Sequence, residues 1–113
     1  MSKISAHVLD TARGHPVADL SVLLDRLDGH EPYRNIAAAV TNQDGRVLDL
    51  VGDARLAVGT YRVVFETAAY FVATQQPVFY PRVVVVFRLT DVSESYHIPL
   101  LLSPYGYSTY RGS

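Results

Sequence analysis

Short runs of apolar and polar residues, separated by turn signals, recur along this chain and restrict the folds open to it. Alternation with a period of two is typical of half-buried β-strands, and Asp-Gly pairs such as Asp44-Gly45 favour tight turns between strands. Together these signals predict strands at 4–9, 20–24, 36–41, 59–65, 83–89, 96–103 and 105–110.

A single segment, residues 66–73, favours a helix. It is rich in alanine, which forms helices well and strands poorly, and Pro77 lies beyond it. Seven or eight short strands with one short helix predict an all-β fold, an antiparallel β-sandwich. A length of 113 residues fits one domain, which is expected to span residues 1–113.

The composition excludes several classes of protein. Hydrophobic residues make up 49% and charged residues 19%, as in globular domains and unlike disordered chains. A net charge of −1 gives no bulk attraction to nucleic acid or a membrane, so neither is expected as a partner. The absence of cysteine excludes disulfides and cysteine-based zinc sites. A polar N-terminus, and no apolar run near the roughly 18 residues of a membrane helix, favour a soluble cytoplasmic protein.

Two histidines fall within predicted strands. His7 lies on the more polar face of the first strand, which suits either a partly exposed strand histidine or a functional one. His97 interrupts an otherwise apolar strand, and Pro99 predicts an edge position or an irregular stretch there, because proline cannot donate to the sheet ladder. A histidine that faces a pocket can act as a general base near neutral pH, and a hydrogen-bonded core histidine is the alternative.

Arg46 and the C-terminus are the other candidates. Arg46 follows the Asp44-Gly45 turn, where a guanidinium either clamps a planar anionic substrate or is solvated at the surface. Residues 107–113 place a phenol, a guanidinium, hydroxyls and a carboxylate close together, although a short frayed end is the alternative. The chain has no glycine-rich phosphate loop, no Gly-x-Ser-x-Gly elbow and no metal-type histidine spacing.

Several motifs resemble those of the 5-hydroxyisourate hydrolases, which share the transthyretin-like fold. They are Ala6-His7-Val8-Leu9-Asp10, Gly14-His15-Pro16-Val17, Asp44-Gly45-Arg46, Tyr70-Phe71, Phe79-Tyr80-Pro81 and the block from Tyr96 to Ser113. The closing Tyr110-Arg111-Gly112-Ser113 separates the hydrolases from the transthyretins. The chain is identified as a member of this family over essentially its whole length. Where many members have His-Tyr-His, this chain has Ser95-Tyr96-His97.

The resemblance implies a homotetramer with active sites in a channel where dimers meet. It implies a cyclic amide hydrolase of urate and purine degradation, which converts 5-hydroxyisourate to 2-oxo-4-hydroxy-4-carboxy-5-ureidoimidazoline without a metal or organic cofactor. The implied catalytic residues are His7, Arg46, His97 and Ser113, and the implied substrate-binding residues are His7, Arg46, Tyr110 and Arg111.

Within that implied site, either His97 or His7 would activate water, and the sequence does not choose between them. Arg46 and Arg111 would bind the ring and stabilise the developing oxyanion, and Tyr110 would orient the substrate. A transthyretin-like carrier of a small aromatic ligand is the alternative function, because a fold does not determine a function. The titratable residues expected in the channel favour the hydrolase.

Overall fold

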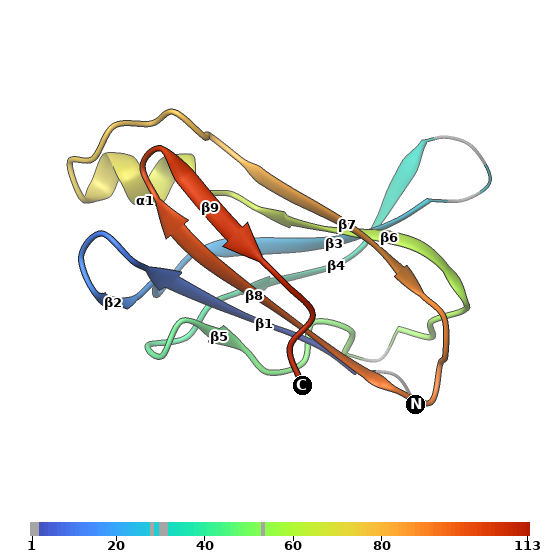
Figure 1. Ribbon diagram of the computed structural model, residues 1–113. Coiled ribbons are helices and arrows are strands. Elements are labelled where there is room, and N and C mark those ends of the chain that lie inside the picture. The colour runs from blue at the N-terminus through green and yellow to red at the C-terminus, as the bar shows by residue number, and fades with distance from the viewer. Residues whose placement is uncertain (1–2, 28, 30–31, 53) are drawn as a thin grey trace.

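The computed structural model describes residues 3–27, 29, 32–52 and 54–113, and it shows two β-sheets with one short helix at one end (Figure 1). The elements are β1 (Lys3–Asp10), β2 (His15–Pro16), β3 (Ser21–Leu27), β4 (Tyr33–Val40), β5 (Arg46–Val47), β6 (Gly59–Phe65), α1 (Ala68–Ala73), β7 (Val83–Leu89), β8 (Ser95–Ser103) and β9 (Gly106–Thr109). Since β2 and β5 have two residues each, seven longer strands remain in the described part. The predicted all-β sandwich with one short helix is confirmed.

The two sheets join segments that are far apart in the sequence. The first has the order β2-β1-β8-β9, with β5 also paired to β1, and the second has the order β4-β3-β6-β7. These pairs are antiparallel except β1 with β8, which run parallel from Lys3↔Ser95 to Asp10↔Leu102. Parallel neighbours need a long crossover, and the chain between β1 and β8 includes the whole second sheet. The expected antiparallel arrangement therefore holds for every pair but this one.

The core follows the alternation of the strands. In β1, Ile4, Ala6 and Val8 are buried, while His7 lies on the opposite, half-buried face, as predicted. The core cluster includes buried side chains of both sheets and of α1, among them Leu24, Tyr61, Phe65, Phe71, Leu89, Leu100 and Leu102. Because full burial of each large apolar side chain contributes roughly 1.5–3 kcal/mol, a shift of β1 by one residue would be costly. The face that carries His7 is thereby kept free for polar groups.

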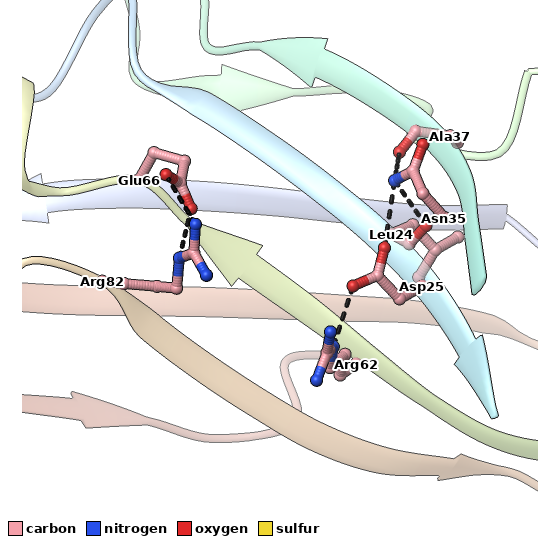
Figure 2. Close-up of polar contacts among 7 residues, drawn as sticks. All are labelled: Leu24, Asp25, Asn35, Ala37, Arg62, Glu66 and Arg82. Atoms are coloured by element: carbon pink, nitrogen blue, oxygen red, sulfur yellow. Dashed lines mark hydrogen bonds and ion pairs between the residues drawn. The ribbon is translucent and has the colours of Figure 1, made fainter. Parts of the chain in front are cut away.

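The hairpin of β3 and β4 extends beyond the predicted segments because pairing continues past a bulge. The register shifts between Leu24 and Asp25. The amide nitrogen of Asn35 lies 3.3 Å from the Leu24 carbonyl oxygen, and 3.0 Å from both Asp25 Oδ1 and the Ala37 carbonyl oxygen (Figure 2). A bulge interrupts the ladder locally, and the Asn35 side chain satisfies acceptors beside it. The strands therefore continue on the far side of the irregularity.

Arg62 connects three strands of the same sheet through an ion pair and a cation–π contact. Arg62 of β6 donates from Nε to Asp25 Oδ2 of β3 at 2.8 Å, and its guanidinium lies 4.1 Å from the ring centroid of Tyr33 in β4. The Asp25 carboxylate is almost fully buried, so loss of Arg62 would leave a buried charge without its cation. A second ion pair in Figure 2 joins Arg82 to Glu66; Nε of Arg82 lies 2.6 Å from Oε1 of Glu66.

The helix α1 begins two residues after the predicted start. The hydroxyl of the buried Thr67 donates to the Tyr80 carbonyl at 2.6 Å, and the N–H of Ala68 donates to the Pro81 carbonyl at 3.0 Å. These tertiary contacts hold the residues before Ala68 in a non-helical connection. In the described ranges, no helix is long and apolar enough to cross a membrane.

A buried carboxylate at the end of β1 connects that strand to α1. Asp10 is 1% exposed, and it accepts bonds from Tyr70 at 2.5 Å, Gln76 at 3.2 Å and the N–H groups of Ala12 and Arg13. Burial alone raises the pKa of Asp10, but these four donors outweigh it and lower the pKa below its usual range. Burial and the Asp10 carboxylate together raise the pKa of Tyr70 to about 12.

The strand β8 is paired unevenly along its length. It pairs with β1 from Ser95 to Leu102 but with β9 only from Leu100 to Ser103, so Pro99 lies in a stretch with a regular ladder on one side alone. The regular ladder with β9 stops at Leu100↔Thr109, and pairing returns only at an isolated bridge between His97 and Gly112. The gap includes Pro99, which has no N–H to donate. The edge or irregular stretch predicted from Pro99 is therefore confirmed.

Candidate active site

A tight turn places Arg46 opposite His7. The side-chain oxygen of Asn42 accepts bonds from the N–H groups of Asp44 and Arg46 at 2.9 and 3.0 Å. Gly45 has a φ of +75°, and a Cβ there would collide with a carbonyl oxygen of β1, so the position requires glycine. The turn leads into β5, where Arg46 is the register partner of His7. The predicted Asp44-Gly45 turn is confirmed.

The imidazole of His7 contacts the same turn. Its Nε2 lies 3.0 Å from the carbonyl oxygen of Asp44. Because a carbonyl oxygen only accepts, Nε2 carries the proton in this contact, and the lone pair of the neutral ring lies on Nδ1. One ring nitrogen of His7 is therefore already engaged by the protein.

His97 of β8 lies beside Ser5 of β1, its register partner in the parallel pair. The Oγ of Ser5 is 2.8 Å from Nδ1 of His97. Partial burial, then the charge of Arg46 and then that of His7 lower the pKa of His97 below its ordinary value of 6.5. His97 is consequently a neutral imidazole at pH 7, the form that can accept a proton.

The chain after β9 folds back onto His97. The N–H of Gly112 donates to the His97 carbonyl at 2.8 Å. A Cβ on Gly112 would lie only 2.5 Å from Cδ2 of His97, so the glycine backbone packs directly against the imidazole. Figure 1 shows this red C-terminal segment turning back past β8 after the end of β9. The segment thus packs on the strand that carries His97.

A hollow of about 400 Å³ lies where β1, β5, β8 and the C-terminal segment meet. Arg46, His97 and Ser113 line it, so the structure brings three of the expected site residues together. His7 is not among the lining residues, although it is the register partner of Arg46. The other lining residues are Lys3, Ser5, Ala6, Val47, Leu48, Ser95 and Tyr96.

The structure does not bring Tyr110 or Arg111 into this hollow. Both line a second hollow of about 240 Å³, which they share with residues of β7. The guanidinium carbon of Arg111 lies 4.4 Å from the centroid of the Tyr96 ring, and Nη2 donates to the Ser95 carbonyl at 3.3 Å. Arg111 therefore contacts β8 of its own chain, and the substrate-binding roles expected for Tyr110 and Arg111 stay predictions.

The sequence pattern assigns no role to three lining residues, Lys3, Ser5 and Ser95. The alternation of β1 is enough to place Ser5 on the same face as His7, but no local signal indicates that β8 lies alongside. Ser95 is the register partner of Lys3. This chain therefore has a hydroxyl and an amine at that end of the hollow.

The groups in the hollow have a clear chemical use. A neutral imidazole can take a proton from water, and a guanidinium can hold the negative charge that develops on an attacked carbonyl oxygen. His97 and Arg46 supply these two groups, which suits attack by water on a carbonyl group. Within the described part of the chain, no group of three or more His, Asp or Glu side chains is arranged to hold a metal ion.

Known proteins match this chain over nearly its full length. The model of the HIUase/Transthyretin family matches residues 4–112. The 5-hydroxyisourate hydrolase of Mus musculus is 42% identical over 113 residues, 99% of this chain and 96% of that protein. The Klebsiella pneumoniae 5-hydroxyisourate hydrolase structure has a TM-score of 0.86 at 34% identity, and the match covers 100% of both chains. Sea bream transthyretin in complex with thyroxine has a TM-score of 0.90 at 27% identity, covering 97% of this chain and 94% of that one.

These matches confirm the resemblance found in the sequence motifs. The family model covers all of the strands except the first residue of β1, and it includes the segments that carry His7, Arg46 and His97. The chain belongs to the HIUase/Transthyretin family.

Proposed function

We propose that this chain is a hydrolase that opens the cyclic amide of 5-hydroxyisourate with water, in the hollow between β1, β5 and β8. The observation that carries the proposal is that the neutral imidazole of His97 and the guanidinium of Arg46 line one hollow. The Mus musculus relative, 42% identical, is named for this activity and supports the same substrate.

In the proposed reaction, Nε2 of His97 takes a proton from water as the water oxygen attacks the amide carbonyl. Arg46 donates N–H bonds to the carbonyl oxygen, where negative charge develops. The C–N bond then breaks, and the imidazolium of His97 returns the proton to the leaving nitrogen. The opened product has a carboxylate and a ureido group, as in 2-oxo-4-hydroxy-4-carboxy-5-ureidoimidazoline.

His97 is the water-activating base in this proposal, and His7 supports binding. Nε2 of His7 donates to the Asp44 carbonyl, whereas the contact of His97 with Ser5 is made through Nδ1 and leaves Nε2 for water. Arg46 of β5 lines the hollow, and His7 of β1 is its register partner beside the hollow, which supports a binding role for His7 next to Arg46. Ser113 lines the same hollow and completes the proposed catalytic set.

We further propose that the protein assembles as a homotetramer in the cytoplasm. Among the described strands, β7 and β9 end their sheets, and exposed edges pair readily with other chains. Val86 of β7 is 57% exposed, and Phe79 and Tyr105 are 60% and 68% exposed, which supports burial of these side chains between copies. Light scattering at micromolar concentration tests this: the mass of four copies supports it, and a stable monomer contradicts it.

A carrier of a small aromatic ligand is the second candidate function. Sea bream transthyretin in complex with thyroxine, with a TM-score of 0.90, has the same fold and is the reason to test it, but the relatives named 5-hydroxyisourate hydrolase do not favour it. The two functions differ in what they require of His97 and Arg46. A hydrolase needs both groups for turnover, whereas a carrier of an apolar ligand needs neither a base nor an oxyanion donor.

Initial rates of the ultraviolet decay of freshly prepared 5-hydroxyisourate test the proposed roles. His97→Asn and Arg46→Ala should each lower the catalysed rate by about 10²–10⁴-fold, while circular dichroism and the melting temperature change little. His15→Asn is the matched control, because His15 is exposed and its Nδ1 contacts only the neighbouring Pro16 carbonyl in the described structure. If both site variants fold and keep near-normal turnover, the assigned roles are wrong.

A further inference from the structure

The contact between Ser5 and His97 joins two strands that are far apart in the sequence. Ser5 is half-buried on the polar face of β1, and its Oγ lies 2.8 Å from Nδ1 of His97. The parallel register that pairs the two residues is continuous from Lys3 to Asp10. The hydroxyl is therefore held in place by the sheet itself and not by a loop.

A hydroxyl can meet Nδ1 of a histidine in two ways. If the hydroxyl donates, the lone pair is on Nδ1 and Nε2 carries the hydrogen; if Nδ1–H donates, the lone pair is on Nε2. Only the second arrangement survives protonation of the ring, because both nitrogens of an imidazolium are donors. A general base gains a proton and returns it in each turnover. It keeps this hydrogen bond in both protonation states only when the hydroxyl accepts the bond from Nδ1–H.

The opposite edge of the ring is restrained independently. The backbone of Gly112 packs so closely against Cδ2 of His97 that an added Cβ would lie 2.5 Å from that atom. Ser5 contacts the Nδ1 edge. With these two edges held, Nε2 is the ring nitrogen left for water in the hollow that His97 lines.

We propose that Ser5 is a positioning residue, which accepts a hydrogen bond from Nδ1–H of His97 and so presents the Nε2 lone pair to the hollow. This inference rests on the proposed hydrolysis and deepens it. Ser5 acts through His97: it selects the tautomer and the orientation of the base.

A neutral partner also suits the charges around the ring. Ionisable groups on the elements packed around the ring include Arg46 and His7, which lower the pKa of His97, and Lys3, which lines the same hollow. Arg111 of the C-terminal segment is paired with Glu94 at 3.5 Å. A carboxylate in place of Ser5 would stabilise the imidazolium and raise the pKa of His97. A serine hydroxyl orients the ring without adding that charge, so His97 remains neutral and ready to accept a proton at pH 7.

Variants of Ser5 separate this positioning role from a merely structural one. Ser5→Ala should lower kcat by about 10–100-fold, by analogy with loss of the outer hydrogen-bond partner of a metal-bound histidine, with KM nearly unchanged because Arg46 is untouched. Ser5→Thr keeps a hydroxyl and should restore most of kcat. Ser5→Asp should move the acid limb of kcat/KM to higher pH. Ser103→Ala is the control, because Ser103 donates to the Gly106 carbonyl at 2.9 Å in the β8–β9 turn.

Nitrogen NMR of the imidazoles, without substrate, tests the tautomer directly. The His97 signals can be assigned by their loss in His97→Asn. The inference expects a protonated Nδ1 and an unprotonated Nε2 in the neutral ring, and a shift toward the Nε2–H form in Ser5→Ala. A protonated Nε2 in the wild-type protein, or full kcat in Ser5→Ala, would overturn the role of Ser5 even if the wild-type protein hydrolyses 5-hydroxyisourate. If NMR finds the expected tautomer but the protein does not hydrolyse 5-hydroxyisourate, the proposed function is overturned instead.

Discussion

Replacement of Gly112 by alanine is expected to displace the imidazole of His97 and to lower turnover without unfolding the protein. The added Cβ would lie 2.5 Å from Cδ2, 3.1 Å from Cγ and 3.2 Å from Cβ of His97. Ordinary contacts between carbon atoms are about 3.5–4.0 Å, so the ring or the C-terminal segment must move by roughly 1 Å.

The cost of that movement falls mainly on catalysis. A misplacement of about 1 Å costs on the order of 10²-fold in rate, and kcat for Gly112→Ala should fall by that factor. Overpacking typically costs ~1–3 kcal/mol of stability, which shifts the melting temperature but leaves the protein folded. Initial rates and a thermal melt measure the two effects on the same sample.

Gly106→Ala is the matched control. Its added Cβ would meet only Ser103 Oγ, at 3.8 Å, which is an ordinary contact. Neither Gly106 nor Gly112 has a positive φ, so backbone strain does not separate the two variants. If Gly112→Ala turns over as fast as Gly106→Ala, the close packing of the C-terminal segment on His97 has no part in catalysis.

Three further outcomes are expected. Truncation after Thr109 removes the backbone bridge to His97 and should abolish most hydrolysis while circular dichroism still reports a folded sandwich. Arg46→Gln removes a charge that lowers the pKa of His97, and since the base must be unprotonated, the acid limb of its residual kcat/KM should move to higher pH. Tyr70→Phe removes a hydrogen bond to the Asp10 carboxylate and should cost roughly 1.5–3 kcal/mol of unfolding free energy in urea. Because the pKa of Tyr70 is raised from 10.0 to about 12, that contribution is complete below pH 10 and is lost as the pH rises through about 12.

Much of the fold could be predicted because local patterns determine individual strands. The predicted segments 59–65 and 83–89 have the same bounds as β6 and β7, since alternation or a valine-rich run marks them and turn signals flank them. The parallel pairing of β1 with β8 could not be predicted, because most of the chain separates these strands and no local pattern records their contact. The bulge at Leu24 and Asp25 also depends on a contact across strands, through the Asn35 side chain.

The candidate site divides in a similar way. Alternation places His7 on the polar face, and the Asp-Gly turn places Arg46 directly after it at the start of β5, so both local positions follow from short-range signals, whereas the pairing of the two residues across β1 and β5 does not. Beyond Thr109 the chain leaves the regular ladder, and the period of two no longer predicts side-chain directions. For this reason the sequence did not predict that the C-terminal residues line two different hollows. Ser113 lines the hollow with His97, whereas Tyr110 and Arg111 line the second hollow beside β7.

Catalysed hydrolysis is tested most directly by adding the protein, at a concentration far below that of freshly prepared 5-hydroxyisourate, and following the ultraviolet decay. If the hollow is an active site, the decay accelerates in proportion to the protein concentration, and each chain consumes many substrate molecules. A carrier would leave the decay of this excess substrate unchanged, or would slow it at equal concentrations by sequestering the ligand. Either of those results would contradict a hydrolytic function for this chain.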